Sequence, residues 1–559
     1  MIEVTDLCVG YVQFRKTSKR LAMTKDTALT NSEALAQTAL VAVVGAGTMG
    51  AGIAQVAAAA GHAVVLYDLR TEAVPTAIEN VRRNFEKLSL KGKISQKAAS
   101  SAIERLGAAA NLGELSGAGI VIEAIAEDLD AKRRLLREIE SLVDPNCILT
   151  TNTSSLSVSA IAAALHAPER LTGMHFFNPA PLMDLVEVVA GLATNPRILA
   201  TVHATARAWG KTPVYVRSTP GFIVNRVARP FYGEALLLLA EQAASPATID
   251  AIMREAGGFR MGPFELMDLV GLDIGLAVSE SLFNAFFGDA RYRPCFIQQE
   301  MVRAGHLGRK ARRGFYSYAD DAAAPLPDTE PSAPKPRRVT LPMAGPLATA
   351  LETRLAGSGI ALSRAANSSS DANCVEIDGT ILAVTDGRSA TQFAQETGRR
   401  NLVTLDLAID YTTAPRVAIA KASTCEDHAY WSAVGLLQAA GYAVSRVKDV
   451  AGIAVMRTVA MLANEAADAV NQGVATPADV DVAIRKGVNY PRGPLAWADD
   501  VGLETVHKVL SNLAAHYGGE RYRVSPRIQE LVWSGRKVYD AAGDGQPASA
   551  TVDSARGYR

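Results

Sequence analysis

His175 and Glu187 are the residues whose types and spacing best suit proton transfer in this chain. His175 ends one short apolar run, 171–176, and Glu187 lies in the next, 185–190, with a Pro-rich turn between the runs. Because the turn can fold the two runs side by side, the carboxylate can accept from one imidazole nitrogen and raise the basicity of the other. A lone histidine near a strand end is more often a core residue, but its carboxylate partner favours a general base acting on a substrate hydroxyl.

Three glycines spaced as G-x-G-x-x-G point to the binding of a dinucleotide. They follow the apolar run 40–44 and open an Ala-rich helical segment. Gly45 permits a tight turn, Gly47 lets the backbone approach a pyrophosphate, and Gly50 lets the helix lie close to the sheet. The amides at the helix N-terminus then face the phosphates. The residues predicted to bind the cofactor here are Gly45, Gly47, Thr48, Met49, Gly50 and, at the end of the next strand, Asp68.

Asp68 bears on the kind of dinucleotide. A carboxylate at this place binds the hydroxyls of the adenine ribose and repels a 2′-phosphate, so we expect NAD. Arg70, two residues on, is the one residue nearby that could contact a 2′-phosphate. With NAD as hydride acceptor and His175 as base, the pattern predicts oxidation of an alcohol.

The polar residues Ser154, Asn225 and Lys91 stay open to a structural or a functional interpretation from the sequence alone. Ser154 follows a strand and is most simply a helix cap. Asn225, near the start of a helical segment, is either a surface residue or a polar group directed at a ligand. Lys91 is either a solvated helix end or a phosphate contact. Glu127 lies just beyond the strand 119–124, where ligands collect in open α/β sheets, and Lys132 lies on the helix that follows.

The elements that must position these residues are of two kinds. Apolar runs alternate with helical periodicity up to about residue 217, which predicts an α/β Rossmann-type NAD domain. Helical periodicity then dominates, in the segments 222–240, 247–256 and 264–287. A Pro- and Ala-rich linker follows, and after it short strands at 380–384, 402–405 and 417–420 alternate with helices, which indicates a second, degenerate α/β segment without a Gly-rich loop.

The last part of the chain repeats the all-α helical domain. The stretch 219–226 aligns with 450–457, and at the same spacing Gly262-Pro263 meets Gly493-Pro494 and 270–272 meets 501–503. Asn225 has become Met456 in the second copy, so we expect copy one to be catalytic and copy two to be structural. The expected domains are a polar extension (1–38), the NAD domain (39–217), helical copy one (218–319), a linker (320–345), the degenerate α/β segment (346–446), helical copy two (447–540) and a tail (541–559).

Composition excludes several classes of protein. The 57 basic and 57 acidic side chains balance, so a nucleic-acid partner is not expected. The five cysteines show no pairing or zinc-type spacing, which suits a reducing cytoplasm and predicts no metal site. No apolar run approaches the roughly 20 residues that span a bilayer, so no membrane association is expected. The polar start lacks the features of a transit peptide, and Met23 is an alternative start.

The chain resembles the 3-hydroxyacyl-CoA dehydrogenases. The motifs that carry the resemblance are GAGTMGAGIAQ (45–55), IEAIAED (122–128), NTSSL (152–156), HFFNPAPLMDLVEVV (175–189), TPGFIVNR (219–226), MGPFELMDLVGLD (261–273) and LGRKARRGFYSY (307–318). The duplicated region is similar to that of long bacterial members, including the 3-hydroxyadipyl-CoA dehydrogenases of phenylacetate breakdown, most closely in GVNYPRGPLAWADDVG (487–502). Arg312 and Arg313 replace the usual small or acidic residues.

The resemblance implies a role for each matched position. It makes His175 the base and Glu187 its orienting partner, and it places Ser154 and Asn225 against the substrate's 3-oxygen. It places Glu127 and Lys132 by the nicotinamide ribose, Asp68 by the adenine ribose, and Lys91 near the CoA phosphates. The implied reaction is NAD-dependent oxidation of an (S)-3-hydroxyacyl-CoA to the 3-oxoacyl-CoA, as in β-oxidation.

Three other hypotheses stay open, as does the length of the acyl chain. The chain could act on a hydroxy acid without CoA, it could be a non-catalytic NAD-binding structural relative, or its second half could dock partner enzymes. The two helical copies suggest a pseudo-dimer within one chain, and further homo-oligomerisation is also open.

Overall fold

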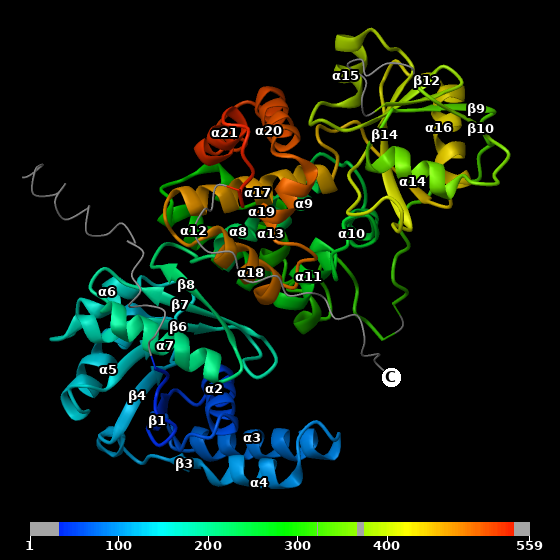
Figure 1. The fold of residues 1–559 in the computed structure, drawn as a ribbon. Coiled ribbons are helices and arrows are strands. Elements are labelled where there is room, and N and C mark those ends of the chain that lie inside the picture. The colour runs from blue at the N-terminus through cyan, green and yellow to red at the C-terminus, as the bar shows by residue number, and fades with distance from the viewer. Residues whose placement is uncertain (1–32, 321, 366–373, 541–559) are drawn as a thin grey trace, which may run out of the picture. The chain divides into compact units, whose positions relative to one another are not determined.

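The computed structural model describes residues 33–320, 322–365 and 374–540, so most of the predicted N-terminal extension and all of the predicted tail lie outside the described residues. The chain divides into two compact units, Met1–Ser218 and Thr219–Arg559 (Figure 1). Each unit is described by itself. Within the described ranges, no helix is long and apolar enough to cross a membrane.

The first unit is built on an eight-stranded sheet with the order β3-β2-β1-β4-β5-β6-β7-β8. Its strands are β1 (Leu40–Val44), β2 (Val64–Tyr67), β3 (Leu106–Ala108), β4 (Ala118–Glu123), β5 (Ile148–Thr151), β6 (Leu171–Phe176), β7 (Leu185–Ala190) and β8 (Thr212–Arg217). Only the β6–β7 pairing is antiparallel. The near-continuous apolar runs of β1 and β4 lie at the centre of this sheet, as strands covered on both faces require.

Helices accompany the sheet of the first unit (Figure 1). They are α2 (Thr48–Ala59), α3 (Ala73–Leu90), α4 (Gln96–Glu104), α5 (Leu129–Leu142), α6 (Val158–Ala162) and α7 (Pro196–Ala208). The sheet order reverses direction at β1 and β4, so the loops after these strands open on the edge where α/β sheets bind ligands. The Rossmann-type prediction is confirmed.

The second unit contains the two helical copies. Copy one comprises α8 (Val224–Val227), α9 (Arg229–Ala240), α10 (Pro246–Glu255), α11 (Pro263–Val270), α12 (Leu272–Ala285) and α13 (Phe296–Arg303). Copy two comprises α17 (Val455–Asn471), α18 (Pro477–Gly487), α19 (Pro494–Val501), α20 (Leu503–Tyr517) and α21 (Pro526–Trp533). The helix expected over 222–240 is broken between α8 and α9, because Pro230 has no N–H to continue the ladder of helical hydrogen bonds.

A second sheet lies between the two copies in sequence, with the order β10-β9-β11-β12-β13-β14-β15. Its strands are β9 (Arg338–Leu341), β10 (Ala361–Arg364), β11 (Cys374–Ile377), β12 (Thr380–Val384), β13 (Leu402–Leu405), β14 (Arg416–Lys421) and β15 (Ala443–Val447). Three helices accompany it, α14 (Pro346–Arg354), α15 (Ala390–Thr397) and α16 (Asp427–Ala439). The predicted linker, 320–345, is too long, because it includes β9; four residues that follow a Pro-rich stretch are too few for periodicity to reveal a strand.

The two helical copies pack against each other within the second unit, where α17 lies against α9 (Figure 1). Buried ion pairs cross between the copies, and two of them form a reciprocal exchange. Arg226 of copy one pairs with Glu465 of copy two at 2.6 Å, and Arg457 of copy two pairs with Glu234 of copy one at 2.7 Å. This reciprocal exchange is the pattern of a self-complementary interface.

Candidate active site

His175 and Glu187 occupy directly opposite positions on the antiparallel strands β6 and β7. His175 Nδ1 lies 2.7 Å from Glu187 Oε2, and both side chains are buried. An ionised carboxylate can only accept, so an ionised Glu187 favours the tautomer that carries its proton on Nδ1. The Phe177 ring packs beside the imidazole, with centroids 4.5 Å apart, and limits its orientation. The structure therefore brings together the pair that the sequence predicted.

The glycines of the β1–α2 loop differ in what demands them. A Cβ on Gly50 would lie 1.7 Å from the Gly45 carbonyl oxygen, and Gly45 itself has φ +104° and faces the Ala124 carbonyl. Gly50 is required by packing, and Gly45 is required both by packing and by its backbone conformation. A Cβ on Gly47 would meet nothing within 4 Å, and its φ of −72° suits any residue. Packing within this unit therefore leaves room at Gly47 for a ligand to approach the backbone, as a pyrophosphate does.

The N-terminus of α2 is suited to an anion. Gly47 is its N-cap and supplies no side-chain acceptor, so the first-turn amides of Thr48 and Met49 are not capped by that residue. Asp68 follows β2, where its Oδ2 accepts from the Ala46 amide at 2.8 Å and its Oδ1 from the Arg70 amide at 3.0 Å. Partial burial raises the pKa of Asp68, but these amides and the Arg70 guanidinium outweigh it and hold the pKa below its usual value. The residues present fit a dinucleotide with an unphosphorylated ribose.

Glu127 is the centre of a second polar cluster, between the ends of β4 and β5. Its Oε1 accepts from the Thr153 hydroxyl at 2.6 Å and from the Ser154 and Ser155 amides, each at 2.9 Å. Burial raises the pKa of this carboxyl, but the Thr153 hydroxyl, the Lys132 ammonium and the amides outweigh it and lower the pKa below its usual value. Glu127 therefore carries a charge and fixes the loop that bears Ser154.

Lys132 lies almost wholly buried beneath this cluster. Its Nζ contacts Glu123 Oε1 at 2.6 Å and Glu127 Oε2 at 3.4 Å. Glu123 also accepts from the Thr151 hydroxyl and the Ile125 amide. Lys132 thus orients Glu127 from below, and Glu123 is a residue that the sequence reasoning missed. The signal for it was an acidic residue at the end of an otherwise apolar strand.

Ser154 is not the helix cap that its position alone suggested. Ser157 caps α6, accepting from the Ala160 amide at 3.2 Å, while the Ser154 hydroxyl lies 3.4 Å from Glu127. Asn152, whose role was not predicted, accepts from the Phe176 amide and so ties the β5 loop to the end of β6 beside His175. Asn225 lies half-buried on α8 of the second unit, between buried neighbours.

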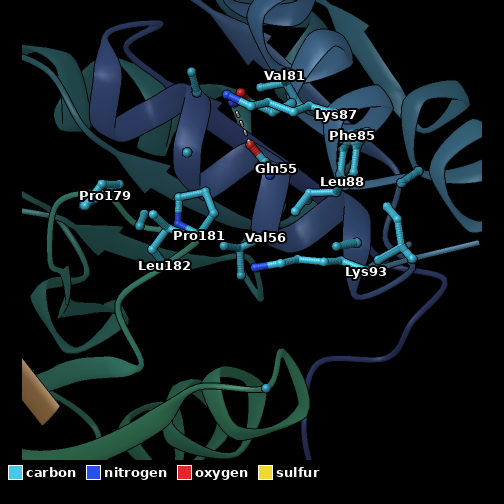
Figure 2. Close-up of a pocket in the computed structure, with 18 of the residues that line it drawn as sticks. Gln55, Val56, Val81, Phe85, Lys87, Leu88, Lys93, Pro179, Pro181 and Leu182 are labelled. Carbon is cyan, nitrogen blue, oxygen red and sulfur yellow. Dashed lines mark hydrogen bonds between the residues drawn. The ribbon is translucent and has the colours of Figure 1, made fainter. Parts of the chain in front are cut away.

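A cleft of about 960 Å³ opens in the first unit among α2, α3 and the loop 179–184 (Figure 2). Lys91 lines this cleft together with Lys87, Lys93 and Lys211. Lys211 donates to the carbonyls of Ala180 and Met183, and its burial lowers its pKa. Figure 2 shows Lys87, in the last turn of α3, and Lys93, just beyond that helix, on the side of the cleft across from Pro181 and Leu182. The wall therefore combines apolar surface with several cations. Among the residues described, no group of three or more His, Cys, Asp or Glu is placed to hold a metal ion.

Comparisons with known proteins show the family of the chain. The profile "3-hydroxyacyl-CoA dehydrogenase, NAD binding domain" matches residues 40–219, and the C-terminal domain profile of the same family matches 221–318 and again 452–544. The chain belongs to the 3-hydroxyacyl-CoA dehydrogenase family. It is an NAD-dependent oxidoreductase that acts on 3-hydroxyacyl-CoA thioesters. The profile "3-hydroxybutyryl-CoA dehydrogenase reduced Rossmann-fold domain" matches 382–450.

Individual relatives show how far the likeness extends. A 3-hydroxyadipyl-CoA dehydrogenase of Escherichia coli K12 is 41% identical over 86% of this chain and 95% of its own length. A crystal structure of a 3-hydroxybutyryl-CoA dehydrogenase from E. coli K12 superposes with a TM-score of 0.81 and 40% identity, over 90% of this chain and 99% of that one. A 3-hydroxybutyryl-CoA dehydrogenase of Clostridioides difficile, 39% identical, matches 50% of this chain and 98% of its own length.

In this dehydrogenase the duplication extends beyond the helical domain. The last three strands of the second sheet repeat the pairing of β6, β7 and β8: β13 and β14 are antiparallel, and β14 and β15 are parallel. Carrying the spacing of the helical repeat back into these strands places Asp406 at the position of His175, Ala418 at that of Glu187 and Met456 at that of Asn225. The strand register agrees with this alignment. The Asp406 amide donates to the Ala418 carbonyl, so these two residues lie opposite each other, as His175 and Glu187 do.

Asp406 has a structural use in place of a catalytic one. Its carboxylate accepts from the backbone amides of Ala454, Val455 and Met456 and so joins the second sheet to the start of α17. Burial raises its pKa to about 6. With aspartate, alanine and methionine at the three positions, the second half of the dehydrogenase holds no counterpart of the His175–Glu187 pair.

Proposed function

We propose that the chain oxidises the 3-hydroxyl of an (S)-3-hydroxyacyl-CoA to a ketone at one active site per chain, with His175 as general base. The observation that carries the proposal is the buried contact of 2.7 Å between His175 Nδ1 and Glu187. Nε2 takes the hydroxyl proton as the C–H bond breaks, and Glu187 stabilises the imidazolium that forms. When bound, NAD supplies the hydride acceptor.

Two further residues are proposed to hold the substrate's 3-oxygen. The Ser154 backbone is held by Glu127, which accepts from its amide, so the hydroxyl can turn from its long 3.4 Å contact with Glu127 to donate to that oxygen without movement of the loop. The Asn225 side-chain amide is the second donor, and it offsets the charge that shifts onto the oxygen. We propose both as catalytic residues.

NAD is proposed to bind across the carboxyl edge of the first sheet. The pyrophosphate would lie on the amides of Thr48 and Met49 against Gly47, and Asp68 would accept from the adenine ribose. Glu127, charged and held from below by Lys132, would accept from the nicotinamide ribose. These placements follow from the open space at Gly47 and from the anionic ends of β2 and β4.

The CoA portion is proposed to occupy the cleft lined by Lys91. Its phosphates would meet Lys91 and the neighbouring cations Lys87 and Lys93, and the methyl and methylene groups of its pantetheine arm would lie along Val56 and Leu182. The volume, about 960 Å³, is at the upper end of ligand-sized clefts. A hydroxy acid without CoA would leave this cleft unused.

The acyl group is proposed to be that of 3-hydroxyadipyl-CoA, because the relative so named is 41% identical over 86% of this chain. The superposed E. coli structure carries the name 3-hydroxybutyryl-CoA dehydrogenase. The two names differ in chain length and in a terminal carboxylate, so both substrates belong in the test.

A panel of substrates tests the proposed function. Steady-state rates with NAD should be highest for a 3-hydroxyacyl-CoA, negligible for the corresponding free 3-hydroxy acids, and much lower when NADP replaces NAD. We expect kcat/KM for 3-hydroxyadipyl-CoA to exceed that for 3-hydroxybutyryl-CoA at least about tenfold, which corresponds to about 1.4 kcal/mol. Equal rates on free acids would refute the CoA assignment, and the reverse order of the two thioesters would refute only the acyl group.

The second half is proposed to act as a built-in partner that forms a pseudo-dimer with copy one. The exchanged pairs Arg226–Glu465 and Arg457–Glu234 support this proposal. We propose the domain boundaries given above, with the linker shortened before β9, and a cytoplasmic location.

A further inference from the structure

The short helix α8, which carries Asn225, is poorly secured by its own backbone. It begins two residues after Phe222, whose φ of +50° is strained for a residue with a side chain, and it ends at Val227, just before the first turn of α9, which contains Pro230. A single helical turn gains too few hydrogen bonds to offset the entropy of ordering it. Contacts from elsewhere must therefore fix the position of Asn225.

Arg226 supplies one such contact, deep in the interface between the two copies. Its side chain is completely buried, and its Nε donates to Glu465 Oε1 at 2.6 Å. The Phe286 ring lies 5.1 Å from the guanidinium carbon, and the two terminal nitrogens have no hydrogen-bond partner among the residues that the structure describes. A buried guanidinium is tolerated only when it is paired, so Glu465 decides where Arg226 can lie.

Glu465 is in turn held by copy one. It lies on α17, 1% exposed, and accepts from the Tyr292 hydroxyl. Its Oε2 lies 3.2 Å from Arg291 Nη1, and Arg291 also pairs with Asp468 of α17. The carboxylate is thus fixed from several sides and presents a rigid acceptor to Arg226.

We propose that Glu465, in the half of the chain without a catalytic pair, is a positioning residue for the reaction: through Arg226 it holds the α8 turn, and with it the amide of Asn225, in the catalytic position. The proposal rests on the proposed role of Asn225. It makes the second half part of the active site's support rather than an inert copy.

The chain contains a matched control for this contact. Glu234 holds Arg457 at 2.7 Å in the reciprocal pair, and Arg457 follows Met456. That turn is secured in other ways: it continues into the 17 residues of α17, and Arg457 also donates to Tyr517 at 2.9 Å and Tyr522 at 2.6 Å. Both carboxylates are buried to the same degree, but only Glu465 supports a turn with a polar residue for the substrate.

The experiment compares Glu465→Gln with Glu234→Gln in the full-length chain. Both changes should lower the melting temperature, because Arg226 loses the carboxylate that accepts from its Nε, and Arg457 loses Glu234 and keeps, among the carboxylates that the structure describes, only Glu241, 3.3 Å away. We expect Glu465→Gln to lower kcat by about tenfold to a hundredfold, the effect of a misplaced catalytic group, with KM for NAD unchanged. Glu234→Gln should change kcat by less than about twofold. Equal losses of kcat in the two variants would overturn the inference.

A double-mutant cycle separates positioning from general loosening. If Glu465 acts through Asn225, Glu465→Gln should have little further effect on kcat in an Asn225→Ala background, less than about twofold, whereas independent effects would multiply. Multiplying effects overturn the inference. If Asn225→Ala itself leaves kcat unchanged, the proposed role of Asn225 fails first, and the inference fails with it.

A milder pair of variants covers the case in which either glutamine variant does not fold. Tyr292→Phe removes the hydroxyl that donates to Glu465, and Tyr522→Phe removes the one that donates to Glu234 at 2.9 Å. A loss of kcat confined to Tyr292→Phe supports the inference, and equal kcat in the two variants contradicts it.

Discussion

At the scale of single residues, the chemistry depends on charges that are fixed before substrate arrives. Glu187 is buried against His175, and Glu127 is surrounded by donors from the β5 loop. Groups that are already oriented need not rearrange as charge develops during the reaction. A preorganised site lowers the activation barrier mainly for this reason. Lys132 and Glu123 contribute indirectly, because Lys132 contacts Glu127 and Glu123 holds Lys132 in place.

Replacing the base should abolish most of the turnover. In His175→Ala no group takes the hydroxyl proton, so kcat should fall by about 10²- to 10⁴-fold, the usual contribution of a general base. The dissociation constant for NAD, measured by fluorescence titration, should change little because the glycine loop is untouched. Asp406→Ala is the matched change in the second half, and it should affect stability more than kcat. A His175→Ala enzyme with near-normal kcat would disprove the assignment.

At the scale of elements, the β1–α2 loop illustrates two separate demands on glycine. Gly50 serves the packing of α2 on the Gly45 turn, whereas space remains beside Gly47 within the first unit. The packing role that the sequence predicted for Gly50 is confirmed by the overlap that a Cβ there would make.

Alanine substitutions should separate these demands. Gly47→Ala should leave the free energy of unfolding within about 0.5 kcal/mol of the wild type, yet raise KM for NAD about tenfold because the methyl group meets the pyrophosphate. Gly50→Ala should lower the free energy of unfolding of the first unit by at least about 1–3 kcal/mol, because its Cβ would overlap the Gly45 carbonyl. Chemical denaturation and steady-state kinetics measure the two effects. Equal losses of stability in both variants would contradict this division.

At the scale of the whole molecule, the second half is proposed to take the place of a second subunit. Its sheet ends in the same strand pairing as the first, and its helical domain places Glu465 where a second copy of α9 would place Glu234. The three positions that match the catalytic ones carry aspartate, alanine and methionine. The chain therefore keeps an interface of two copies while having one proposed active site.

Truncation of the chain after Tyr318 should show whether copy two takes the place of a second subunit. Without copy two, Arg226 lacks Glu465, and the way to pair it again is with Glu234 of a second truncated chain. Size-exclusion chromatography with light scattering should show a dimer, and kcat should fall on dilution as the dimer dissociates. A stable monomer with full activity would argue against the pseudo-dimer and against Glu465 as a positioning residue.

By itself, the sequence determined the local elements and the identity of the chemical groups. The ranges Leu40–Val44, Leu171–Phe176 and Leu185–Ala190 match the strands observed, because buried parallel strands and their turns have strong local signals. The Gly-rich loop, Asp68 and the His175–Glu187 pair were also predicted, since each belongs to a motif of neighbouring residues. The short strand β9 and the break at Pro230 were not, because four residues carry little periodicity and one proline in a helical pattern is ambiguous.

Only the tertiary structure decided which distant groups pair. The contacts of Glu123 with Lys132, of Glu127 with Thr153, and of Arg226 with Glu465 join different elements, and no local pattern specifies such pairs. The role of Asp406 is likewise visible only once strand register places it opposite Ala418 and against α17. Burial makes each of these contacts necessary, because a charge removed from water must find a partner, and the fold determines which partner is within reach.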